Sequence, residues 1–390
     1  MNIAVINSGS SSIKFQLFCM EKNEVLAHIL VEKIGESISD MILEYEDKKL
    51  EIITVIKNHH DGLEEIISLL SKHSLLKDFT SLSAIGHRVV HGGEEFKSAT
   101  IIDENIIKKI EALIPLAPLH NPANLEGILV AIKKAPNVPQ IAVFDTAFHS
   151  NMPEEAYIYA LPYEMYEKYK IRRYGFHGTS HSYVLKQTAK LLQKNLNELN
   201  IITLHLGNGS SACAIENGVS IDTSMGFTPL EGLVMGSRCG DVDPAIIIHM
   251  QRELGMSVDE VDKLLNKKSG LIGICKNNDV RTIIEQNDEK SQLAIKVMVR
   301  RIKKYIGAYM ALLDRVDAVV FTGGIGENSA YIREMVLSSL LYEIELDKSL
   351  NAQNSTIIST KKSSVKLMVI KTDEEQEIAN ECLSLLKNQF

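Results

Sequence analysis

Short apolar runs alternate along the chain with segments whose apolar residues recur every three or four positions. Runs at residues 3–6, 141–144 and 318–321 have the length of buried strands. Helix spacing is found at Leu63, Ile66, Ile67 and Leu70, and again at Val299, Ile302, Ile306, Tyr309 and Leu313. Strands that alternate with helices are typical of α/β proteins, so the pattern predicts an α/β fold.

A last helix is expected near the C-terminus. Thr372 and Glu375 have the spacing of a capping box, in which each side chain binds a free backbone N–H at the start of a helix. The sequence therefore predicts a helix over residues 375–390, and we expect it to pack on the N-terminal domain.

The strand–turn–strand pattern at the N-terminus recurs in the second half of the chain. The stretch IAVINSGSSSIKFQL at 3–17 is similar to TLHLGNGSSACAI at 203–215, with Gly9, Ser10 and Ser11 matching Gly209, Ser210 and Ser211. One hairpin is weak support, because Gly and Ser favour turns in any fold. Two similar hairpins, each heading about half of the chain, indicate a duplicated fold with a nucleotide held between the halves.

The two halves are expected to meet near residues 151–157. Met152 and Pro153 end an apolar run there, and two acidic residues follow. We therefore expect an N-terminal domain at 1–150 and a second domain at 151–374. The length of 390 residues suits two or three domains, since a domain usually has about 100–200 residues.

Composition and charge exclude several classes of protein. The net charge of −8 argues against a sequence-independent nucleic-acid binder, and the basic pairs Arg172-Arg173 and Arg300-Arg301 are small. No apolar run reaches the roughly 18 residues of a membrane span, and no secretory signal is recognisable. The five cysteines are scattered and form no CxxC pair, which favours reduced thiols and a cytoplasmic location.

Two kinds of glycine-rich element could bind phosphate. In the hairpins, backbone N–H groups of a Gly/Ser turn can point at an anion, and Lys14 on the outgoing strand can add a charge. Such a turn is as often purely structural. At 317–337 a strand runs into Gly323, Gly324 and Gly326 before a helix, an arrangement that presents free N–H groups and a positive dipole end. The chain has neither a GxxxxGK[ST] loop nor a GxGxxG motif.

Several polar residues stand at expected strand ends, most of them near glycines, where α/β proteins build their sites. They are Arg88 in GHRVVHGGEEF, Asp145 in VFDTAFH, His177 in YGFHGTSH and Arg238 in MGSRCGDVDP. Each of them could serve structure alone, and Asp145 could simply cap a turn. Zinc is disfavoured, because glycines disturb the helices that His87/His91 and His177/His181 would need and no HExxH occurs.

Taken together, eight motifs in one order resemble those of the acetate kinase family. They are INSGSSSIKF, GHRVVHGGE, VFDTAFH, RRYGFHGTSH, HLGNGSSACAI, MGSRCGDVDP, FTGGIGEN and TDEE, and the resemblance extends from near residue 1 to about residue 380. It implies two related α/β domains of the actin, Hsp70 and sugar-kinase type, with the nucleotide site in the cleft between them. It also implies transfer of the ATP γ-phosphoryl group to acetate, giving acetyl phosphate and ADP, by a cytoplasmic homodimer.

The resemblance also implies roles for individual residues. Asn7 and Glu374 take the positions that bind Mg²⁺, for which Mn²⁺ could substitute, and Arg88 takes the position that binds the substrate carboxylate. Asp145, His177 and Arg238 take the catalytic positions. The nucleotide positions are Lys14, His205, Leu206, Gly207, Asn208, Gly209, Asp279, Val280, Arg281, Gly324, Ile325, Gly326, Glu327 and Asn328.

The sequence leaves the role of Asp145 and the substrate open. A carboxylic acid with a pKa of about 4 is already ionised at pH 7, so acetate needs no base. We therefore expect Asp145 to orient Mg²⁺-bound water or an arginine rather than to remove a proton. The alternatives to an acetate kinase are a propionate kinase or another short-chain acyl kinase and, from a different class, a non-catalytic ATP-gated binding protein.

Overall fold

The computed structural model describes residues 1–338 and 344–388, which form two compact units. Unit 1 comprises residues 1–150 and the C-terminal residues from Asp373 onward, and unit 2 comprises residues 151–372. The sequence predicts a boundary after residue 374, whereas residues 373 and 374 group with unit 1 in the structure.

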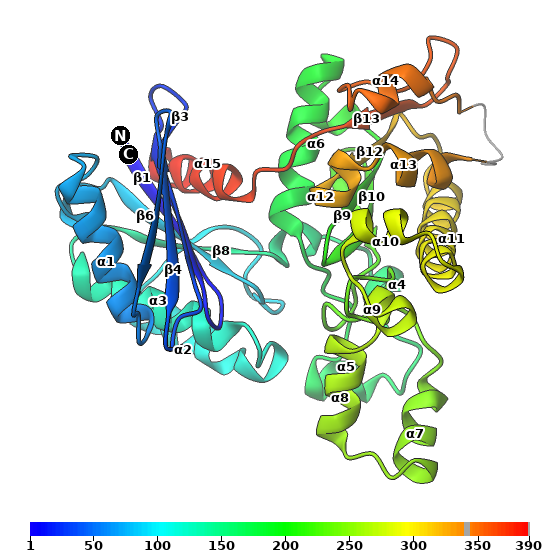
Figure 1. Ribbon diagram of the computed structural model, residues 1–390, viewed down its shortest axis with the longest axis horizontal. Helices are drawn as coiled ribbons and strands as arrows, with labels where there is room; N and C mark the ends of the chain where they lie inside the picture. Colours follow the sequence, from blue (N-terminus) through cyan, green and yellow to red (C-terminus); the bar gives the residue numbers. More distant parts are fainter. Residues whose placement is uncertain (339–343, 389–390) are drawn as a thin grey trace. The chain divides into compact units, whose positions relative to one another are not determined.

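Unit 1 contains an eight-stranded sheet in the order β5-β4-β3-β2-β1-β6-β8-β7 (Figure 1). Its strands are β1 (Asn2–Ser8), β2 (Ile13–Cys19), β3 (Glu24–Glu32), β4 (Ser39–Tyr45), β5 (Lys48–Thr54), β6 (Ala84–Val89), β7 (Thr100–Ile101) and β8 (Gln140–Phe144). Its α-helices are α1 (His59–Lys72), α2 (Glu104–Ala112), α3 (Asn121–Lys134) and α15 (Glu374–Lys387). Short 3₁₀ turns are η1 (Phe79–Ser81), η2 (Ile114–Leu116) and η3 (Ala147–His149).

The two faces of strand β1 bury alternate side chains. Ala4 and Ile6 belong to the core that is shared with α1 and α3. Ile3 and Val5 belong to a second core on the other face, where α15 packs through residues that include Ile378. Successive side chains of a strand point to opposite faces, so the apolar run at the N-terminus is explained by a strand buried on both sides.

Unit 2 contains a five-stranded sheet in the order β11-β10-β9-β12-β13. Its strands are β9 (Ile201–Leu206), β10 (Ser210–Glu216), β11 (Val219–Thr223), β12 (Ala318–Thr322) and β13 (Lys366–Val369). Its α-helices are α4 (Glu154–Tyr157), α5 (Glu164–Tyr169), α6 (Gly178–Leu192), α7 (Pro244–Glu253), α8 (Val258–Lys267), α9 (Gly270–Cys275), α10 (Val280–Gln286), α11 (Glu289–Leu312), α12 (Gly323–Asn328), α13 (Ala330–Leu337) and α14 (Lys348–Ala352). The 3₁₀ turn η4 is Leu196–Glu198.

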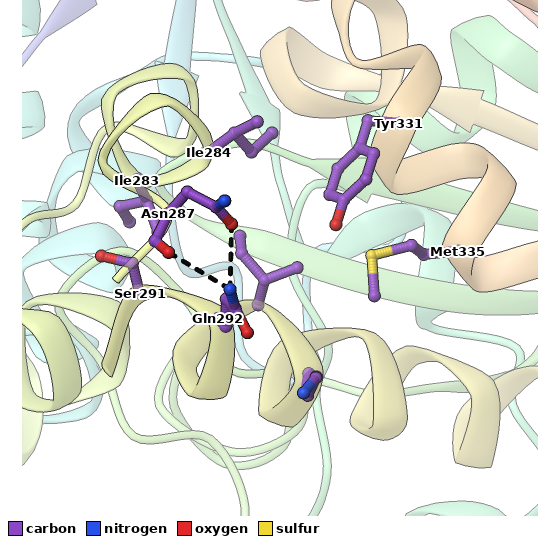
Figure 2. A pocket seen from close by; sticks show the side chains of 9 residues that line it. Ile283, Ile284, Asn287, Ser291, Gln292, Tyr331 and Met335 are labelled. Atoms are coloured by element: carbon purple, nitrogen blue, oxygen red, sulfur yellow. Dashed lines mark hydrogen bonds between the residues drawn. The ribbon is translucent and has the colours of Figure 1, made fainter. Parts of the chain in front are cut away.

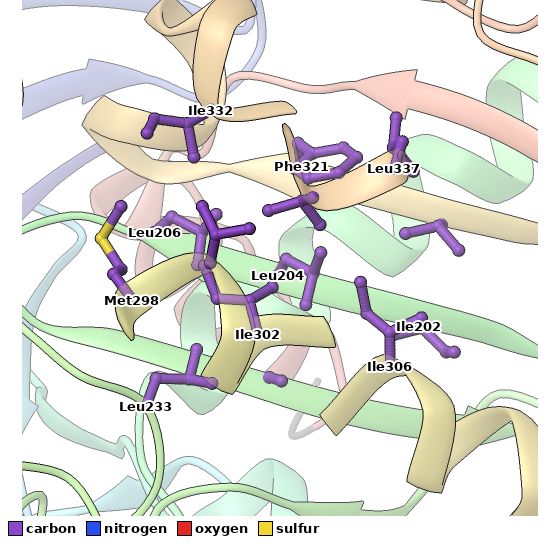
Figure 3. Packing of buried hydrophobic residues seen from close by; sticks show 14 of the residues in the cluster. Ile202, Leu204, Leu206, Leu233, Met298, Ile302, Ile306, Phe321, Ile332 and Leu337 are labelled. Carbon is purple, nitrogen blue, oxygen red and sulfur yellow. The ribbon is translucent and has the colours of Figure 1, made fainter. Parts of the chain in front are cut away.

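Helices cover both faces of this sheet. Leu204 of β9 and Phe321 of β12 pack against Ile302 and Ile306 of the long helix α11 (Figure 3). On the other face, α6 is joined to β9 by a hydrogen bond between His181 Nδ1 and the hydroxyl of Thr203 at 2.7 Å. The helix predicted from the spacing of residues 299–313 is therefore confirmed as part of α11.

The two units repeat one strand pattern. In unit 1, β3-β2-β1 are antiparallel neighbours and β1-β6-β8 are parallel neighbours. In unit 2, β11-β10-β9 are antiparallel and β9-β12-β13 are parallel, in the same order. The predicted α/β fold with two related domains is confirmed, whereas the position of the nucleotide stays a prediction.

The two hairpin turns differ in one detail from the sequence match. Both Gly9 and Gly209 lie in turns, as expected. Ser10 and Ser11 lie in the first turn, whereas Ser210 and Ser211 already belong to β10. The second turn is therefore shorter than the first.

The predicted start of the C-terminal helix is wrong by one position. Asp373, not Thr372, is the N-cap of α15, and its carboxylate accepts a hydrogen bond from the backbone N–H of Gln376. The helix ends at Lys387, and the last two residues of the predicted range, 389 and 390, lie outside the described residues.

Candidate functional site

Arg88 and Asp145 form a two-point ion pair in unit 1. Strands β6 and β8 are parallel neighbours, so the residues at and just beyond their carboxyl ends lie close together. Arg88 Nε donates to Asp145 Oδ1 at 3.0 Å and Arg88 Nη2 donates to Oδ2 at 2.6 Å. The Asp145 side chain is only 2% exposed, and that of Arg88 is 19% exposed. A planar guanidinium is suited to this fork, which fixes the orientation of both groups.

Further carboxylates surround this pair. Burial alone would lower the pKa of Arg88, but the negative charges of Asp145 and Glu374 raise it above its usual value. Burial and the neighbouring Glu374 also raise the pKa of Glu375. The start of α15 thus brings two adjacent carboxyl groups, one of them with a raised pKa, into the electrostatic range of Arg88.

The residues of unit 1 that are expected at the metal are an amide and a carboxylate. Asn7 lies on β1 directly opposite Lys14 on β2, and Glu374 begins α15. Oxygen donors of this kind suit Mg²⁺. A cation bound here would also offset the repulsion between the carboxylates of Glu374 and Glu375. The donor chemistry therefore fits the metal that the sequence implies.

A histidine that no motif singled out supports the first Gly/Ser turn. Gly9 N–H donates to the carbonyl of Ser12 at 2.8 Å, which closes the turn. The buried ring of His59 contacts the Gly9 carbonyl through Nε2 at 2.6 Å and Glu126 through Nδ1 at 3.3 Å. His59 begins α1, so the turn is tied to a helix of the core.

In unit 2 the second hairpin turn and the strand–glycine–helix turn lie side by side. A Cβ atom at Gly207 would lie 3.9 Å from the backbone nitrogen of Gly324. Gly323 has a φ of +75°, and a Cβ atom there would lie 2.7 Å from the carbonyl oxygen of Leu206. Only glycine fits so close to the neighbouring backbone, which explains why the turn after β12 has a glycine at position 323.

His177 and Arg238 both face the turn at Gly209. A Cβ atom on Gly209 would lie 3.3 Å from Nε2 of His177 and 3.8 Å from Nη1 of Arg238. His177 precedes α6 in a left-handed conformation with a φ of +56°. Its ring stacks on His205 with centroids 4.2 Å apart, and its Nδ1 lies 2.9 Å from the Ser211 hydroxyl. Gly178 was expected to disfavour a helix here, but it begins α6.

Arg238 carries a charge that the described residues leave without a carboxylate. Its Nη1 donates to the carbonyl of Pro229 at 3.0 Å and contacts the sulfur of Met235 at 3.7 Å. Within residues 1–338 and 344–388 it forms no ion pair, in contrast to Arg88. Burial lowers the pKa of Arg238, because no neighbouring anion compensates its charge. A partly buried cation without a counter-ion is suited to binding an anion.

The expected nucleotide positions differ in what their side chains can offer. Leu206 and Val280 are buried in the core, so only their backbone groups are available to a ligand. Glu327 Oε1 already accepts hydrogen bonds from the backbone N–H groups of Gly323 and Thr372. Asp279 and Arg281 bind each other, with Arg281 Nη2 2.7 Å from Asp279 Oδ2. This pairing and the helix-cap hydrogen bonds hold the pKa of Asp279 at about 2.

A pocket of about 470 Å³ lies among three helices of unit 2 (Figure 2). Ile283 and Ile284 of α10, Gln292 of α11, and Tyr331 and Met335 of α13 contribute to its wall. Asp279 caps helix α10, Val280 and Arg281 begin it, and α13 follows residues 324–328. The pocket therefore adjoins two segments that are expected to hold the nucleotide, although none of those positions lines it.

Hydroxyl groups contact three histidines of unit 2. Ser180 lies 2.8 Å both from His205 Nδ1 and from the hydroxyl of Thr372. Ser211 lies between His177 Nδ1 and His181 Nε2, at 2.9 and 2.8 Å. The sequence did not predict these contacts, because the partners are far apart along the chain. Both ring nitrogens of His181 contact hydroxyl groups, so this histidine is held as part of the structure.

The two basic pairs of the sequence are partly structural. Arg172 is buried, and its guanidinium lies 3.6 Å from the centre of the Tyr157 ring. Arg173 and Arg301 donate hydrogen bonds to backbone carbonyls. None of the described helices is long and apolar enough to cross a membrane.

The chain is similar to known proteins over its whole length. The model of the acetokinase family matches residues 2–380. An acetate kinase of Sulfurimonas denitrificans is 61% identical over 99% of this chain and 100% of its own length.

Two solved structures share the fold with a TM-score of 0.93. They are an acetate kinase of Porphyromonas gingivalis, 42% identical over 99% of both chains, and a propionate kinase of Francisella tularensis, 43% identical over 97% of this chain and 98% of its own. Together with the residues gathered at the carboxyl ends of the strands in each unit, these matches establish that the chain belongs to the acetokinase family, whose members are kinases that transfer a phosphoryl group to a carboxylate.

Proposed function

We propose that the chain transfers the γ-phosphoryl group of ATP to acetate, giving acetyl phosphate and ADP in a reversible reaction. The observation that carries this proposal is the charge of Arg238. Its guanidinium lies beside His177 and the Gly209 turn, and within the described residues it has no carboxylate partner. Phosphoryl transfer needs positive charge and N–H donors around the moving group, and this cluster supplies both.

The nucleotide phosphates bind to the glycine turns in this proposal. Asn208 and Gly209 offer backbone N–H groups beside the start of α12 at Gly323 and Gly324, whereas the N–H of Gly207 closes the turn by donating to the Gly209 carbonyl. His177 and Arg238 stabilise the charge on the transferring group. Lys14, a residue of unit 1, binds the phosphates. Residues 279–281 and 324–328 hold the rest of the nucleotide. Leu206 and Val280 contribute only through their backbone.

Acetate is bound by Arg88. Asp145 occupies Nε and Nη2 of this guanidinium, which leaves Nη1 free of that pair for the substrate carboxylate. Acetate is ionised at neutral pH, so no base is needed to generate the nucleophile. Asp145 therefore orients Arg88, and its own two oxygen atoms are engaged by the arginine.

Asn7 and Glu374 would hold Mg²⁺, with Mn²⁺ as a substitute. When bound, the metal supplies positive charge that neutralises the phosphate oxygens. The residues themselves contribute an amide oxygen and a carboxylate from two elements of unit 1. The rigid β1–β2 hairpin and the start of α15 fix these donors.

A propionate kinase is the second candidate, because the Francisella structure with that name has the same fold at 43% identity. One methylene in an apolar pocket is worth about 1–3 kcal/mol. We therefore expect both substrates to react, with different values of kcat/KM. A non-catalytic ATP-gated protein is the least favoured candidate, since it would have no use for the Arg88–Asp145 pair.

We also propose a homodimer that forms through unit 2, in the cytoplasm. Helix α7 has no buried residue, although Ile246, Ile248 and the following Leu254 are apolar and exposed. A second copy would cover this helix. Light scattering should give twice the mass of the chain, and Ile246→Glu together with Ile248→Glu should give the monomer mass.

One assay tests the proposed activity. Folded protein with MgATP and acetate should form acetyl phosphate, which hydroxylamine traps as a hydroxamate. Propionate and butyrate are compared in parallel, and the highest kcat/KM should be found with acetate. Absence of product with every short-chain carboxylate would refute the proposal, and a preference for propionate would replace acetate as the substrate.

A further inference from the structure

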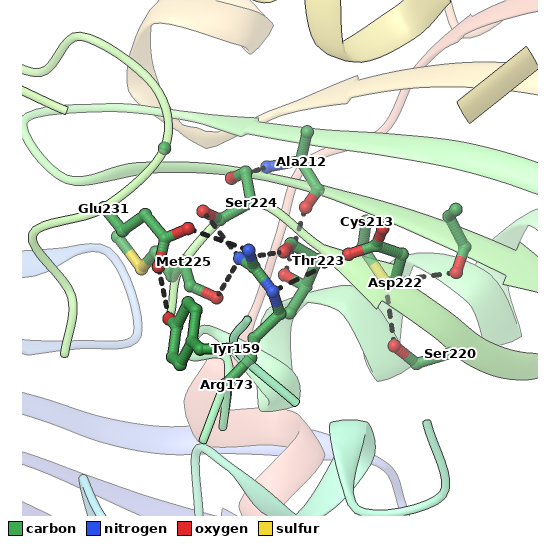
Figure 4. Close-up of polar contacts among 12 residues, drawn as sticks. Tyr159, Arg173, Ala212, Cys213, Ser220, Asp222, Thr223, Ser224, Met225 and Glu231 are labelled. Carbon is green, nitrogen blue, oxygen red and sulfur yellow. Dashed lines mark hydrogen bonds and ion pairs between the residues drawn. The ribbon is translucent and has the colours of Figure 1, made fainter. Parts of the chain in front are cut away.

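Arg173 is the centre of a polar cluster in unit 2 that the sequence did not predict (Figure 4). Its Nη1 donates to the carbonyls of Thr223 at 2.8 Å, Met225 at 3.2 Å and Ser224 at 3.3 Å. Its Nη2 donates to Glu231 Oε1 at 2.8 Å. The side chain is 16% exposed, so these contacts are made largely away from water.

This cluster closes the loop at residues 223–231. Arg173 binds three carbonyls at the start of the loop and the carboxylate of Glu231 at its end. The hydroxyl of Tyr159 donates to Glu231 Oε2 and accepts from the backbone N–H of Phe227 at 2.9 Å. Burial and the neighbouring Glu231 carboxylate raise the pKa of Tyr159, so the phenol keeps its donating proton.

The packing around the middle of the loop leaves no room for a side chain at Gly226. A Cβ atom on Gly226 would lie 1.7 Å from Glu231 Oε2 and 2.1 Å from the Tyr159 hydroxyl oxygen. The backbone N–H of Tyr174, next to Arg173, donates to the Gly226 carbonyl at 3.0 Å. The loop is therefore held at its start, its middle and its end by the segment that carries Arg173.

The loop in turn fixes a backbone acceptor of Arg238. The carbonyl of Pro229, between Gly226 and Glu231, receives the hydrogen bond from Arg238 Nη1 at 3.0 Å. Within the described part of the chain Arg238 has no carboxylate to hold it, so this carbonyl sets the direction of the guanidinium.

We infer that Arg173, Glu231 and Tyr159 are positioning residues for phosphoryl transfer, which act by aiming Arg238 through the Pro229 carbonyl. The inference rests on the proposed function of Arg238. Arginine and not lysine is needed at 173, because only a planar fork can bind several carbonyls and a carboxylate at once.

The test is a double-mutant cycle on kcat. Glu231→Gln keeps the shape of the side chain but removes the charge that holds Arg173. In the wild-type background it should lower kcat on the order of 10- to 100-fold, because a small misplacement of a catalytic group has that cost. The KM for ATP should change less than threefold. In an Arg238→Ala background the same substitution should lower kcat by less than twofold.

A matched control separates positioning from loss of stability. Asp317 is a partly buried carboxylate that binds Lys194 at 2.9 Å and the backbone N–H of Asn200, before the start of β12. Asp317→Asn should lower the melting temperature of the protein but leave kcat within twofold. Tyr159→Phe removes one hydroxyl and gives a milder test. It should lower kcat about threefold to tenfold in the wild-type background. In the Arg238→Ala background it too should lower kcat by less than twofold.

The possible outcomes distinguish the positioning role of the cluster from the proposed function of the chain. No acyl phosphate from the wild-type protein would contradict the proposed function itself. An active wild type in which Glu231→Gln and Tyr159→Phe lower kcat by equal factors with and without Arg238 would overturn the positioning role and leave the function intact.

Discussion

Arg88 Nη2 lies 2.6 Å from Oδ2 of Asp145, and Nε of the same arginine lies 3.0 Å from Oδ1. Both carboxylate oxygens are thus turned toward the guanidinium. An acid that served as a general base would need an oxygen directed at the substrate proton. Acetate carries no such proton at neutral pH, so the pair is explained better as an oriented clamp for the substrate carboxylate.

Arg88→Ala and Arg238→Ala should affect different constants. Loss of Arg88 should raise the KM for acetate, because this side chain binds the carboxylate before the reaction. Loss of Arg238 should lower kcat on the order of 100-fold or more, because its charge acts on the transferring group. Steady-state kinetics with both substrates varied will separate the two effects. Arg300→Ala, at an exposed arginine of α11, is the control and should change neither constant. A change only in the KM for ATP in both variants would contradict the assignment.

Gly323→Ala should destabilise the protein by about 1–3 kcal/mol, because it forces a side chain into a left-handed conformation. The Cβ atom would also meet the Leu206 carbonyl at 2.7 Å. Gly307→Ala is the matched control, since this exposed glycine of α11 has no neighbouring atom within 4 Å. It should stabilise the protein by about 0.5–1 kcal/mol. Urea unfolding measures both changes, and equal effects would show that the turn is not under this constraint.

His87 should make the stability of the protein depend on pH. Burial lowers the pKa of His87 from 6.5 to about 4, and its Nε2 lies 2.8 Å from Gln140 Oε1. Between these two pH values the unfolded chain binds a proton that the folded protein rejects, so stability falls as the pH falls. From pH 7.5 to pH 5 the loss from this group is about 2 kcal/mol.

The variant His87→Gln removes the titrating group. It should be less stable than the wild type at pH 7.5, and the gap should narrow by about 2 kcal/mol at pH 5. Unfolding midpoints at the two pH values give the answer. A gap that stays constant would mean that the pKa of His87 is the same in the folded and the unfolded protein.

Features that depend on neighbouring residues could be predicted from the sequence. The hairpins at β1–β2 and β9–β10, helix α1 and the turn from β12 to α12 follow from short patterns of apolar residues and glycine. Contacts between distant residues could not be predicted. Thr372 fits a capping box, but its N–H is bound by Glu327 and its hydroxyl lies beside Ser180, so Asp373 caps α15 instead.

In the candidate site, too, features marked by neighbouring residues could be predicted and contacts between distant residues could not. Strand ends and glycines marked Arg88, Asp145, His177 and Arg238, and the structure joins the first two in unit 1 and brings the last two to one turn in unit 2. The roles of these residues remain predictions. Arg173 appeared as half of a basic pair, and nothing near it in the sequence indicates Glu231 as its partner. Such a cluster forms only when the loop at 223–231 folds back.

The measurement that tests the clamp most directly is kcat against pH for the wild type and for Asp145→Asn. The variant keeps the shape of the side chain but loses the charge that holds Arg88. We predict that the KM for acetate rises, as in Arg88→Ala, and that the acid limb of the profile is the same in both proteins. That limb should follow the ionisation of acetate and ATP. An acid limb that is present in the wild type and vanishes in Asp145→Asn, with an unchanged KM for acetate, would identify Asp145 as a general base and contradict the clamp.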